Sequence, residues 1–303
     1  MEACKVIVLL STYNGEQYLQ EQLESIYNQT YSNIEILVRD DASKDNTRSI
    51  LKVAEDENKI KLITGKNLGF VNSFFELLKQ APLADYYAFA DQDDIWEKDK
   101  IQRAVETLEK NKNENIPTMY YSNYDFYDRN MKFVSHPKKR NKTSFLNSLV
   151  ECVNLGTTTL INNQVRQQIL KNVPKENSLG HDWWIYMFCS AFGKVIYDDL
   201  PEVKHRIHRN NTSKCGESLF KKYKRRIKVL FGDNHFKKLD KQIQQFRECF
   251  YSQLTKDNKE IMDLFLKPKT LKKQIQKLFY PKKIMNLWNE EITLRIGFLL
   301  WLI

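Results

Sequence analysis

Short apolar segments alternate with amphipathic segments over the first 111 residues of the chain. Segments 5–10, 34–38, 60–63 and 86–90 have the length and apolar composition of buried strands. Segments 18–27, 43–57, 68–80 and 98–111 carry apolar residues at helical spacing. Strands that alternate with helices of this length are joined by crossover connections. We therefore predict an α/β fold with a Rossmann-like, mostly parallel sheet flanked by helices.

Polar residues follow three of these strands at the point where each strand ends. They are Ser11-Thr12, Asp40-Asp41 and Asp91-Gln92-Asp93-Asp94. Ligands of open parallel sheets bind outside the carboxyl ends of the strands, so we expect these residues to line one crevice. Three carboxylates within residues 91–94 repel one another, and a bound divalent cation would relieve that repulsion. The structural alternative, helix caps and turn formers, is the interpretation we adopt for Asp45 and Asp99.

The loop after the first strand lacks the signature of a common class of nucleotide-binding enzyme. A glycine-rich G-x-G-x-x-G segment is absent there, and a Walker loop occurs nowhere in the chain. These absences argue against a dinucleotide-dependent oxidoreductase and against a P-loop enzyme.

The pattern changes in the second half of the chain. Segments 118–128, 157–161, 195–198 and 202–208 resemble strands, and 183–191 resembles an apolar helix introduced by Gly180-His181-Asp182. From residue 214 onward the sequence has long helical stretches with lysine-rich faces. We predict a catalytic domain at residues 1–212 and a basic, amphipathic helical extension at 213–303.

The net charge of +10 is concentrated in that extension. Residues 1–200 have a net charge of −4, whereas 201–303 have a net charge of +14. Segment 221–228 holds six cations interleaved with apolar residues, and segment 298–303 is apolar and aromatic. A solvated face would explain such a run, but basic amphipathic helices also bind anionic membrane surfaces. Nucleic acid is not expected as a partner because no reader motif occurs.

Cysteine spacing and hydropathy bear on the cellular compartment. The five cysteines are scattered and form no C-x-x-C pair, which favours a reducing cytosol. The N-terminal apolar run at 6–10 is too short for a signal peptide, and no apolar run is long enough for a membrane-spanning helix. We expect a cytoplasmic protein, peripheral on the cytoplasmic face of the plasma membrane.

The ordered motifs resemble those of the family 2 glycosyltransferases with the GT-A fold. The motifs are Ser11-Thr12-Tyr13-Asn14-Gly15, Arg39-Asp40-Asp41-Ala42-Ser43, Asn67-Leu68-Gly69 and residues 91–94. Gly180-His181-Asp182-Trp183-Trp184 and Arg206-Ile207-His208-Arg209-Asn210-Asn211 are similar to the bacterial rhamnosyltransferase-like branch. The resemblance covers about residues 4–212, and its strength lies in the order of the motifs.

The resemblance implies a metal-dependent, inverting transfer of a sugar from a nucleoside-diphosphate donor, with Mg²⁺ or Mn²⁺ at the leaving diphosphate. It implies that Asp93 binds the metal, that Asp91 contacts the ribose or the metal, and that Asp94 substitutes for either. His208 would join the metal or the diphosphate. The nucleoside would be held by Thr12, Tyr13 and Asp41.

The resemblance also implies that Asp182 is the general base that takes the proton of the acceptor hydroxyl. The alternative is a helix N-cap, and both roles can coexist. Many relatives carry Glu-Asp at this point, whereas this chain carries His181-Asp182. Further candidates for substrate contact are Asn67, Gly156, His181, Trp183, Trp184 and Arg206, with one tryptophan ring of the pair alternatively in the core.

The expected donor is dTDP-rhamnose, and the expected acceptor is a hydroxyl of a lipid-linked or growing cell-surface polysaccharide. Three alternatives stay open at this point. The first is a member of the same family that uses a UDP-hexose donor. The second is a non-catalytic relative that binds a membrane or a polyanion. The third is a nucleotidyltransferase, although the glycine-rich, basic first loop of that class is missing.

Overall fold

The structure is a computed structural model that describes residues 3–113, 115–175, 178–208, 235–266 and 270–300. The described residues divide into two compact units. The first lies within Met1–Lys138, Asn154–Val173 and Gly193–Cys215, and the second within Lys139–Val153, Pro174–Phe192 and Gly216–Ile303. The second unit therefore includes two segments from the predicted catalytic domain. The predicted boundary at residue 212 remains a prediction.

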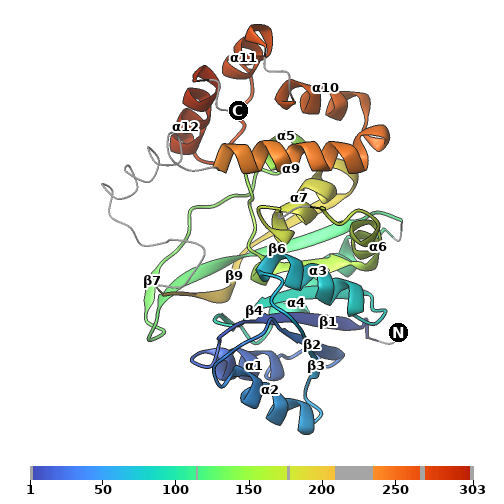
Figure 1. Cartoon of the computed structure of the whole chain (residues 1–303), viewed down its shortest axis with the longest axis vertical. Coiled ribbons are helices and arrows are strands. Elements are labelled where there is room, and N and C mark those ends of the chain that lie inside the picture. The colour runs from blue at the N-terminus through green and yellow to red at the C-terminus, as the bar shows by residue number, and fades with distance from the viewer. Residues whose placement is uncertain (1–2, 114, 176–177, 209–234, 267–269, 301–303) are drawn as a thin grey trace. The chain divides into compact units, whose positions relative to one another are not determined.

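The described part of the first unit is built on a nine-stranded sheet, whose main path runs β3-β2-β1-β4-β8-β6-β9-β5 (Figure 1). Its parallel half consists of β1 (Val6–Thr12), β2 (Ile34–Asp40), β3 (Lys61–Thr64) and β4 (Tyr86–Asp91). In this half, β1 lies between β2 and β4, so Thr12 pairs with Asp40 and Ser11 pairs with Asp91. The predicted convergence of these strand ends is confirmed.

The other half of the sheet is mixed. It contains β8 (Thr159–Asn162), β6 (Thr118–Asp128) and β9 (Lys194–Ile207), with β5 (Ile95–Trp96) at the edge and β7 (Phe133–Ser135) paired to β6. β8 is antiparallel to both of its neighbours, whereas β6 and β9 are parallel. The two strands predicted at 195–198 and 202–208 are one strand. An irregular register against β6, near Asn123, accommodates the interruption at Pro201.

Helices cover both faces of this sheet, as the apolar periodicity predicts. Helices α1 (Leu19–Tyr27), α2 (Thr47–Asp56) and α4 (Lys100–Lys110) share a buried cluster with the even-numbered residues of β1. Helices α3 (Phe70–Gln80) and α6 (Asn163–Lys171) contact the opposite face. There the Phe74 ring lies 5.8 Å from that of Phe89, and the Arg166 guanidinium lies 5.1 Å from the Tyr87 ring centroid.

The described part of the second unit is helical. It comprises α5 (Phe145–Ser148), α7 (His181–Phe192), α9 (His235–Phe250), α10 (Lys256–Phe265), α11 (Leu271–Leu278) and α12 (Trp288–Leu299), with a short 3₁₀ turn at Tyr251–Gln253. Its core brings Trp184 and Phe188 of α7 against Phe250 of α9. Segment 221–228 lies outside the described residues. Within the parts that the structure describes, no helix is long and apolar enough to span a bilayer.

Candidate active site

The loops after β1 and β4 are joined by one side-chain amide. Gln92 accepts a hydrogen bond from the Tyr13 backbone N–H at 2.8 Å and donates one to the Tyr13 carbonyl at 3.0 Å. A Cβ atom at Gly15 would lie 2.3 Å from the Gln92 Oε1 atom, so any larger residue there would displace the Gln92 side chain. The Tyr13 side chain is 44% exposed. The result is an accessible ring on a fixed backbone, which suits contact with a planar base.

Asp40, at the end of β2, is fully buried, and its carboxylate accepts hydrogen bonds from other residues of the protein. Its carboxylate accepts from the Ser43 backbone N–H at 3.0 Å and from the Arg48 Nε–H at 2.8 Å. The Thr12 hydroxyl donates to the same carboxylate at 3.4 Å, and Thr12 is 1% exposed. These contacts fix the chain after β2. Thr12 therefore lies beneath the surface of the site, with its hydroxyl directed at Asp40.

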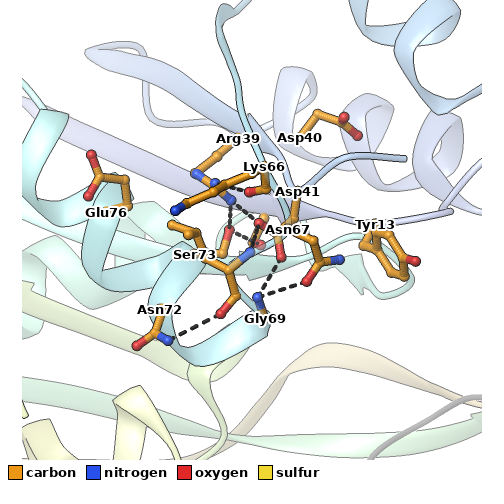
Figure 2. A network of polar contacts seen from close by, with 12 residues as sticks. Tyr13, Arg39, Asp40, Asp41, Lys66, Asn67, Gly69, Asn72, Ser73 and Glu76 are labelled. Carbon is orange, nitrogen blue, oxygen red and sulfur yellow. Dashed lines mark hydrogen bonds and ion pairs between the residues drawn. The ribbon is translucent and has the colours of Figure 1, made fainter. Parts of the chain in front are cut away.

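Asp41 lies at the centre of a second network, which connects β2 with the start of α3 (Figure 2). One carboxylate oxygen accepts from Arg39 and from the Leu68 backbone N–H, and the other accepts from the Gly69 N–H at 2.9 Å. The Arg39 guanidinium also donates to the Ser73 hydroxyl at 3.1 Å. Figure 2 shows Arg39, Asp41 and Ser73 directed toward one another. In this structure Asp41 holds the 67–69 loop.

Asn67 and Gly69 shape the turn that Asp41 holds. The Asn67 side-chain oxygen accepts from the Gly69 N–H at 3.0 Å, and Asn67 is exposed. Gly69 has a φ of 77°, a conformation that strains residues with a Cβ atom. Asn67 is therefore accessible to a ligand, as its predicted role requires.

Asp93 and His208 meet directly, although 115 residues separate them. The His208 Nε2 atom lies 2.8 Å from the Asp93 Oδ2 atom, and both side chains are partly exposed, at 12% for His208 and 17% for Asp93. The His208 ring also stacks on the Tyr18 ring with a centroid separation of 5.0 Å. The structure thus brings together two predicted metal ligands, one from the loop after β4 and one from the end of β9.

Asp94 is turned away from that pair, and its metal role stays a prediction. Its side chain is 0% exposed. The Oδ1 atom lies 2.8 Å from the His205 Nδ1 atom and accepts from the Arg206 backbone N–H at 3.2 Å. Burial opposes the charged form of His205, but Asp94, Asp93 and Asp91 outweigh it and raise the pKa of His205 to about 9. Asp94 and His205 therefore form a buried ion pair that anchors the loop.

Arg206 is held by protein groups in the structure, and its substrate contact stays a prediction. It is 2% exposed. Its guanidinium donates to the Asp93 carbonyl at 3.1 Å, the Arg129 carbonyl at 2.9 Å and the Glu21 carboxylate at 2.6 Å. Its Cζ atom also lies 4.5 Å from the Tyr18 ring centroid. Because every side of the guanidinium faces protein, Arg206 fixes the backbone that carries Asp93.

The residues present fit a two-ligand site for a divalent cation. Among the residues described, no group of three or more His, Cys, Asp or Glu side chains is arranged to hold a metal ion. Mg²⁺ and Mn²⁺ sites at phosphates often use only one or two protein ligands, and the phosphates and water supply the others. A carboxylate and an imidazole, side by side and partly exposed, match that requirement.

Asp182 belongs to the second unit, in the first turn of α7. Its Oδ1 atom accepts from the Trp183 backbone N–H at 2.8 Å, and the side chain is partly exposed. A Cβ atom at Gly180 would lie 2.2 Å from that oxygen. The glycine therefore leaves room for the carboxylate in its present place. Its role as a base stays a prediction.

Most of the other residues around Asp182 are buried. His181 is 1% exposed, and burial lowers its pKa to about 3, so the ring is neutral at pH 7. The Trp183 indole donates to the Ser148 carbonyl at 2.7 Å. Trp184 is 0% exposed and packs against Phe246 and Phe250. Of the two alternatives for the tryptophan pair, a core position therefore holds for Trp184, which offers no face to a sugar.

Gly156 begins a buried 3₁₀ turn that precedes β8. The next residue, Thr157, accepts a hydrogen bond from the Trp96 indole at 3.1 Å. This turn lies in the first unit, and its predicted contact with a donor sugar stays a prediction.

Three residues that position the site are not predicted from the sequence. Gln92 lies inside one of the motifs, but a glutamine at this position does not by itself indicate that its side chain binds the Tyr13 backbone. His205 stands between Lys204 and Arg206 in β9 and has no local signal, whereas Arg39 does give one, because it is a charged residue directly after the apolar run of β2. Such a residue needs a buried partner, and the aspartates of the strand ends are available.

Comparison with known proteins places this geometry in context. The model of a family described as glycosyl transferase family 2 matches residues 7–173. A dTDP-rhamnosyl transferase, RfbG of Shigella flexneri, is 32% identical over 228 residues, which cover 71% of this chain and 77% of the relative. An Escherichia coli enzyme, the UDP-Glc:alpha-D-GlcNAc-diphosphoundecaprenol beta-1,3-glucosyltransferase WfgD, is 34% identical over 166 residues, covering 53% of this chain and 61% of the relative.

Solved structures share the fold at low sequence identity. TarS of S. aureus in complex with UDP superposes with a TM-score of 0.54 at 17% identity, over 86% of each chain. The mannosyltransferase PcManGT of Pyrobaculum calidifontis, in complex with GDP-Man and Mn²⁺, gives 0.56 at 15% identity, over 87% of this chain and 69% of the other. The predicted GT-A architecture, with helices at the C-terminus, is confirmed.

Proposed function

Because the chain belongs to glycosyltransferase family 2, we propose that it transfers rhamnose from dTDP-rhamnose to a hydroxyl of a lipid-linked or growing cell-surface saccharide. The observation that carries the proposal is the Asp93–His208 pair at the carboxyl ends of β4 and β9. The RfbG relative supports the rhamnosyl donor, since it is named a dTDP-rhamnosyl transferase. The name of WfgD supports a lipid-linked acceptor.

The nucleoside end of the donor would lie along the β1 and β2 ends. Tyr13 offers an accessible ring for the base, and its backbone is fixed by Gln92. Asp41 would act chiefly through the 67–69 loop that it holds, because both of its oxygens already accept protein hydrogen bonds. Asp91, paired with Ser11 across β1 and β4, is partly exposed and would contact the ribose.

The diphosphate end would lie at Asp93 and His208, and these two residues would hold the divalent cation. The cation would stabilise the negative charge that develops on the leaving diphosphate. The chain supports this position in two ways. Arg206 fixes the Asp93 carbonyl, and the Asp94–His205 ion pair anchors the following residue.

Asp182 would supply the base. The acceptor oxygen attacks the anomeric carbon, the bond from that carbon to the diphosphate oxygen breaks, and the acceptor proton passes to the Asp182 carboxylate. Attack from the face opposite the diphosphate inverts the anomeric centre. The partial exposure of Asp182 supports this role, as does the space that Gly180 leaves for its oxygen.

A UDP-hexose donor is the second candidate, favoured by the likeness to WfgD, which is named a UDP-Glc transferase. The test is a donor panel that scores nucleotide release with Mn²⁺, using dTDP-rhamnose, UDP-glucose and UDP-GlcNAc. We expect turnover to be fastest with dTDP-rhamnose. Faster turnover with a UDP-hexose would establish the second candidate, and no turnover with any donor would favour a non-catalytic relative.

The basic segment 221–228 would hold the enzyme at an anionic membrane surface, near a lipid-linked acceptor, on the cytoplasmic face. Its six cations with interleaved apolar residues support this location. Replacing the six cations by glutamine in the full chain should weaken co-sedimentation with anionic vesicles. Unchanged co-sedimentation would refute the role of this segment.

A further inference from the structure

The exposed apolar side chains of the second unit gather on two helices. In and just after α11, Leu271, Ile275 and Phe279 are 63%, 48% and 75% exposed. In α12, the exposed residues are Trp288, Ile292, Ile296 and Leu299, between 39% and 71%. Both sets recur at helical spacing, so each forms one stripe. We name these seven residues the α11–α12 patch.

Helix α11 has the reverse of the usual burial pattern. Its polar Gln274 and Lys277 are 4% and 1% exposed, while Leu271 and Ile275 face outward. The Lys277 ammonium lies 5.2 Å from the Phe298 ring centroid and 5.7 Å from that of Phe265. A lone exposed leucine needs no explanation, but a continuous apolar stripe turned outward marks an interaction surface.

The two helices are fixed to each other by Arg295. Its guanidinium donates to the carbonyls of Lys277, Leu278, Tyr280 and Lys282, which close the end of α11, and it also pairs with Glu291 of α12. A cavity of about 580 Å³ lies between the helices, lined by Phe279, Trp288 and Ile292 among others. The patch is therefore a preformed surface.

The sequence around the patch is rich in lysine. Segment 264–289 contains seven lysines and no acidic residue. Lys272 and Lys282 are exposed, and the Lys283 ammonium lies 4.7 Å from the Trp288 ring centroid. The next acidic residues, Glu290 and Glu291, are paired with Arg140 and Arg295. An apolar stripe with an aromatic ring and surrounding lysines complements the surface of a bilayer that contains anionic lipids.

We propose that the α11–α12 patch inserts into the headgroup region of an anionic membrane, with Phe279 and Trp288 entering the boundary of the acyl chains. This surface is distinct from segment 221–228. The inference rests on the proposed function only in that a lipid-linked acceptor would lie at the same membrane.

The test compares two double variants of the full chain by co-sedimentation with vesicles of equal parts phosphatidylglycerol and phosphatidylcholine. Phe279→Ser/Trp288→Ser alters the patch. Val53→Ser/Leu83→Ser removes residues of similar exposure, 59% and 71%, from the first unit. We expect the patch variant to bind at least about tenfold more weakly, since one large apolar side chain is worth roughly that factor in partitioning. The control should bind like wild type.

A second comparison tests the charge. Lys282→Gln/Lys283→Gln should weaken binding to these vesicles, whereas Lys79→Gln/Lys110→Gln should not. Equal binding by the patch variant and wild type would overturn the proposal. A second result would also overturn it: wild type is a dimer that does not bind vesicles, and the patch variant is a monomer. A second copy of the chain would then cover the patch. Transfer to a soluble acceptor, assayed without vesicles, reports separately on the proposed function.

Discussion

Asp93 and Asp94 are adjacent in the sequence, yet their carboxylates face different surroundings. Asp93 is partly exposed beside His208, whereas Asp94 is buried beside His205. The sequence predicts the carboxylate cluster from its position at the end of a predicted strand. Residue type and spacing do not distinguish the two aspartates, and only the family resemblance favours Asp93 as the metal ligand, because their surroundings are set by two histidines more than 110 residues away. Motif and spacing therefore predict which segment forms the site, but they do not predict the role of each oxygen.

The Asp94–His205 pair gives a prediction about stability. His205→Gln leaves a buried carboxylate without its charged partner and should lower the free energy of unfolding by about 3 kcal/mol at pH 7. The folded-state pKa of about 9 lies above the ordinary value of 6.5. The stabilisation is therefore complete below about pH 6.5 and is lost as the pH rises through 9. Urea unfolding of both proteins at several pH values checks this. If the difference in free energy of unfolding between the two proteins does not decrease above pH 9, the ion pair is contradicted.

Gly180 gives a second prediction at this scale. Gly180→Ala places a methyl group where the Asp182 oxygen now lies, so the carboxylate must move. A displaced base should lower kcat by about tenfold or more while leaving the KM for the donor unchanged. Asp182→Asn is the reference, and circular dichroism confirms the fold of both variants. Wild-type kcat in the alanine variant would show that the position of this carboxylate is not critical.

At the scale of elements, most helices and strands of residues 1–111 follow from periodicity. The apolar runs of β1, β2 and β4 are buried on both faces, which makes them recognisable in the sequence. β5 has only two residues and no such run. The sequence predicts β9 as two pieces because Asp198, Asp199 and Pro201 interrupt its apolar pattern. Its continuity depends on pairing with β6, which no local pattern reveals.

The Gln92 side chain, which joins the loops after β1 and β4, gives a prediction for these elements. Gln92→Leu removes both hydrogen bonds to the Tyr13 backbone. We expect the KM for the donor to rise several-fold, because the ring of Tyr13 loses its fixed support, with a stability loss of only about 1 kcal/mol. Gln80→Leu, on the exposed end of α3, is the control. Equal KM values in the two variants would show that the contact between Gln92 and Tyr13 does not contribute to donor binding.

At the scale of the whole molecule, the sequence predicts a helical C-terminal region but not the makeup of the unit that contains it. Segments 139–153 and 174–192 join the C-terminal helices through contacts between distant residues. The Asn147 side chain donates to the Ile284 carbonyl at 2.8 Å, and Trp184 packs on Phe246. Each of these pairings links residues far apart in the sequence, and neither composition nor periodicity indicates them.

The central claim is that Asp93 and His208 hold a cation at the diphosphate of a nucleotide sugar. The most direct measurement is nucleotide release from dTDP-rhamnose as a function of Mn²⁺ concentration, in wild type, Asp93→Asn and the exposed control Asp56→Asn. We predict that wild type and the control are inactive after chelation and recover with Mn²⁺. Asp93→Asn should stay at least about a hundredfold slower at saturating Mn²⁺. Full wild-type activity after chelation, or full activity of Asp93→Asn, would contradict the claim.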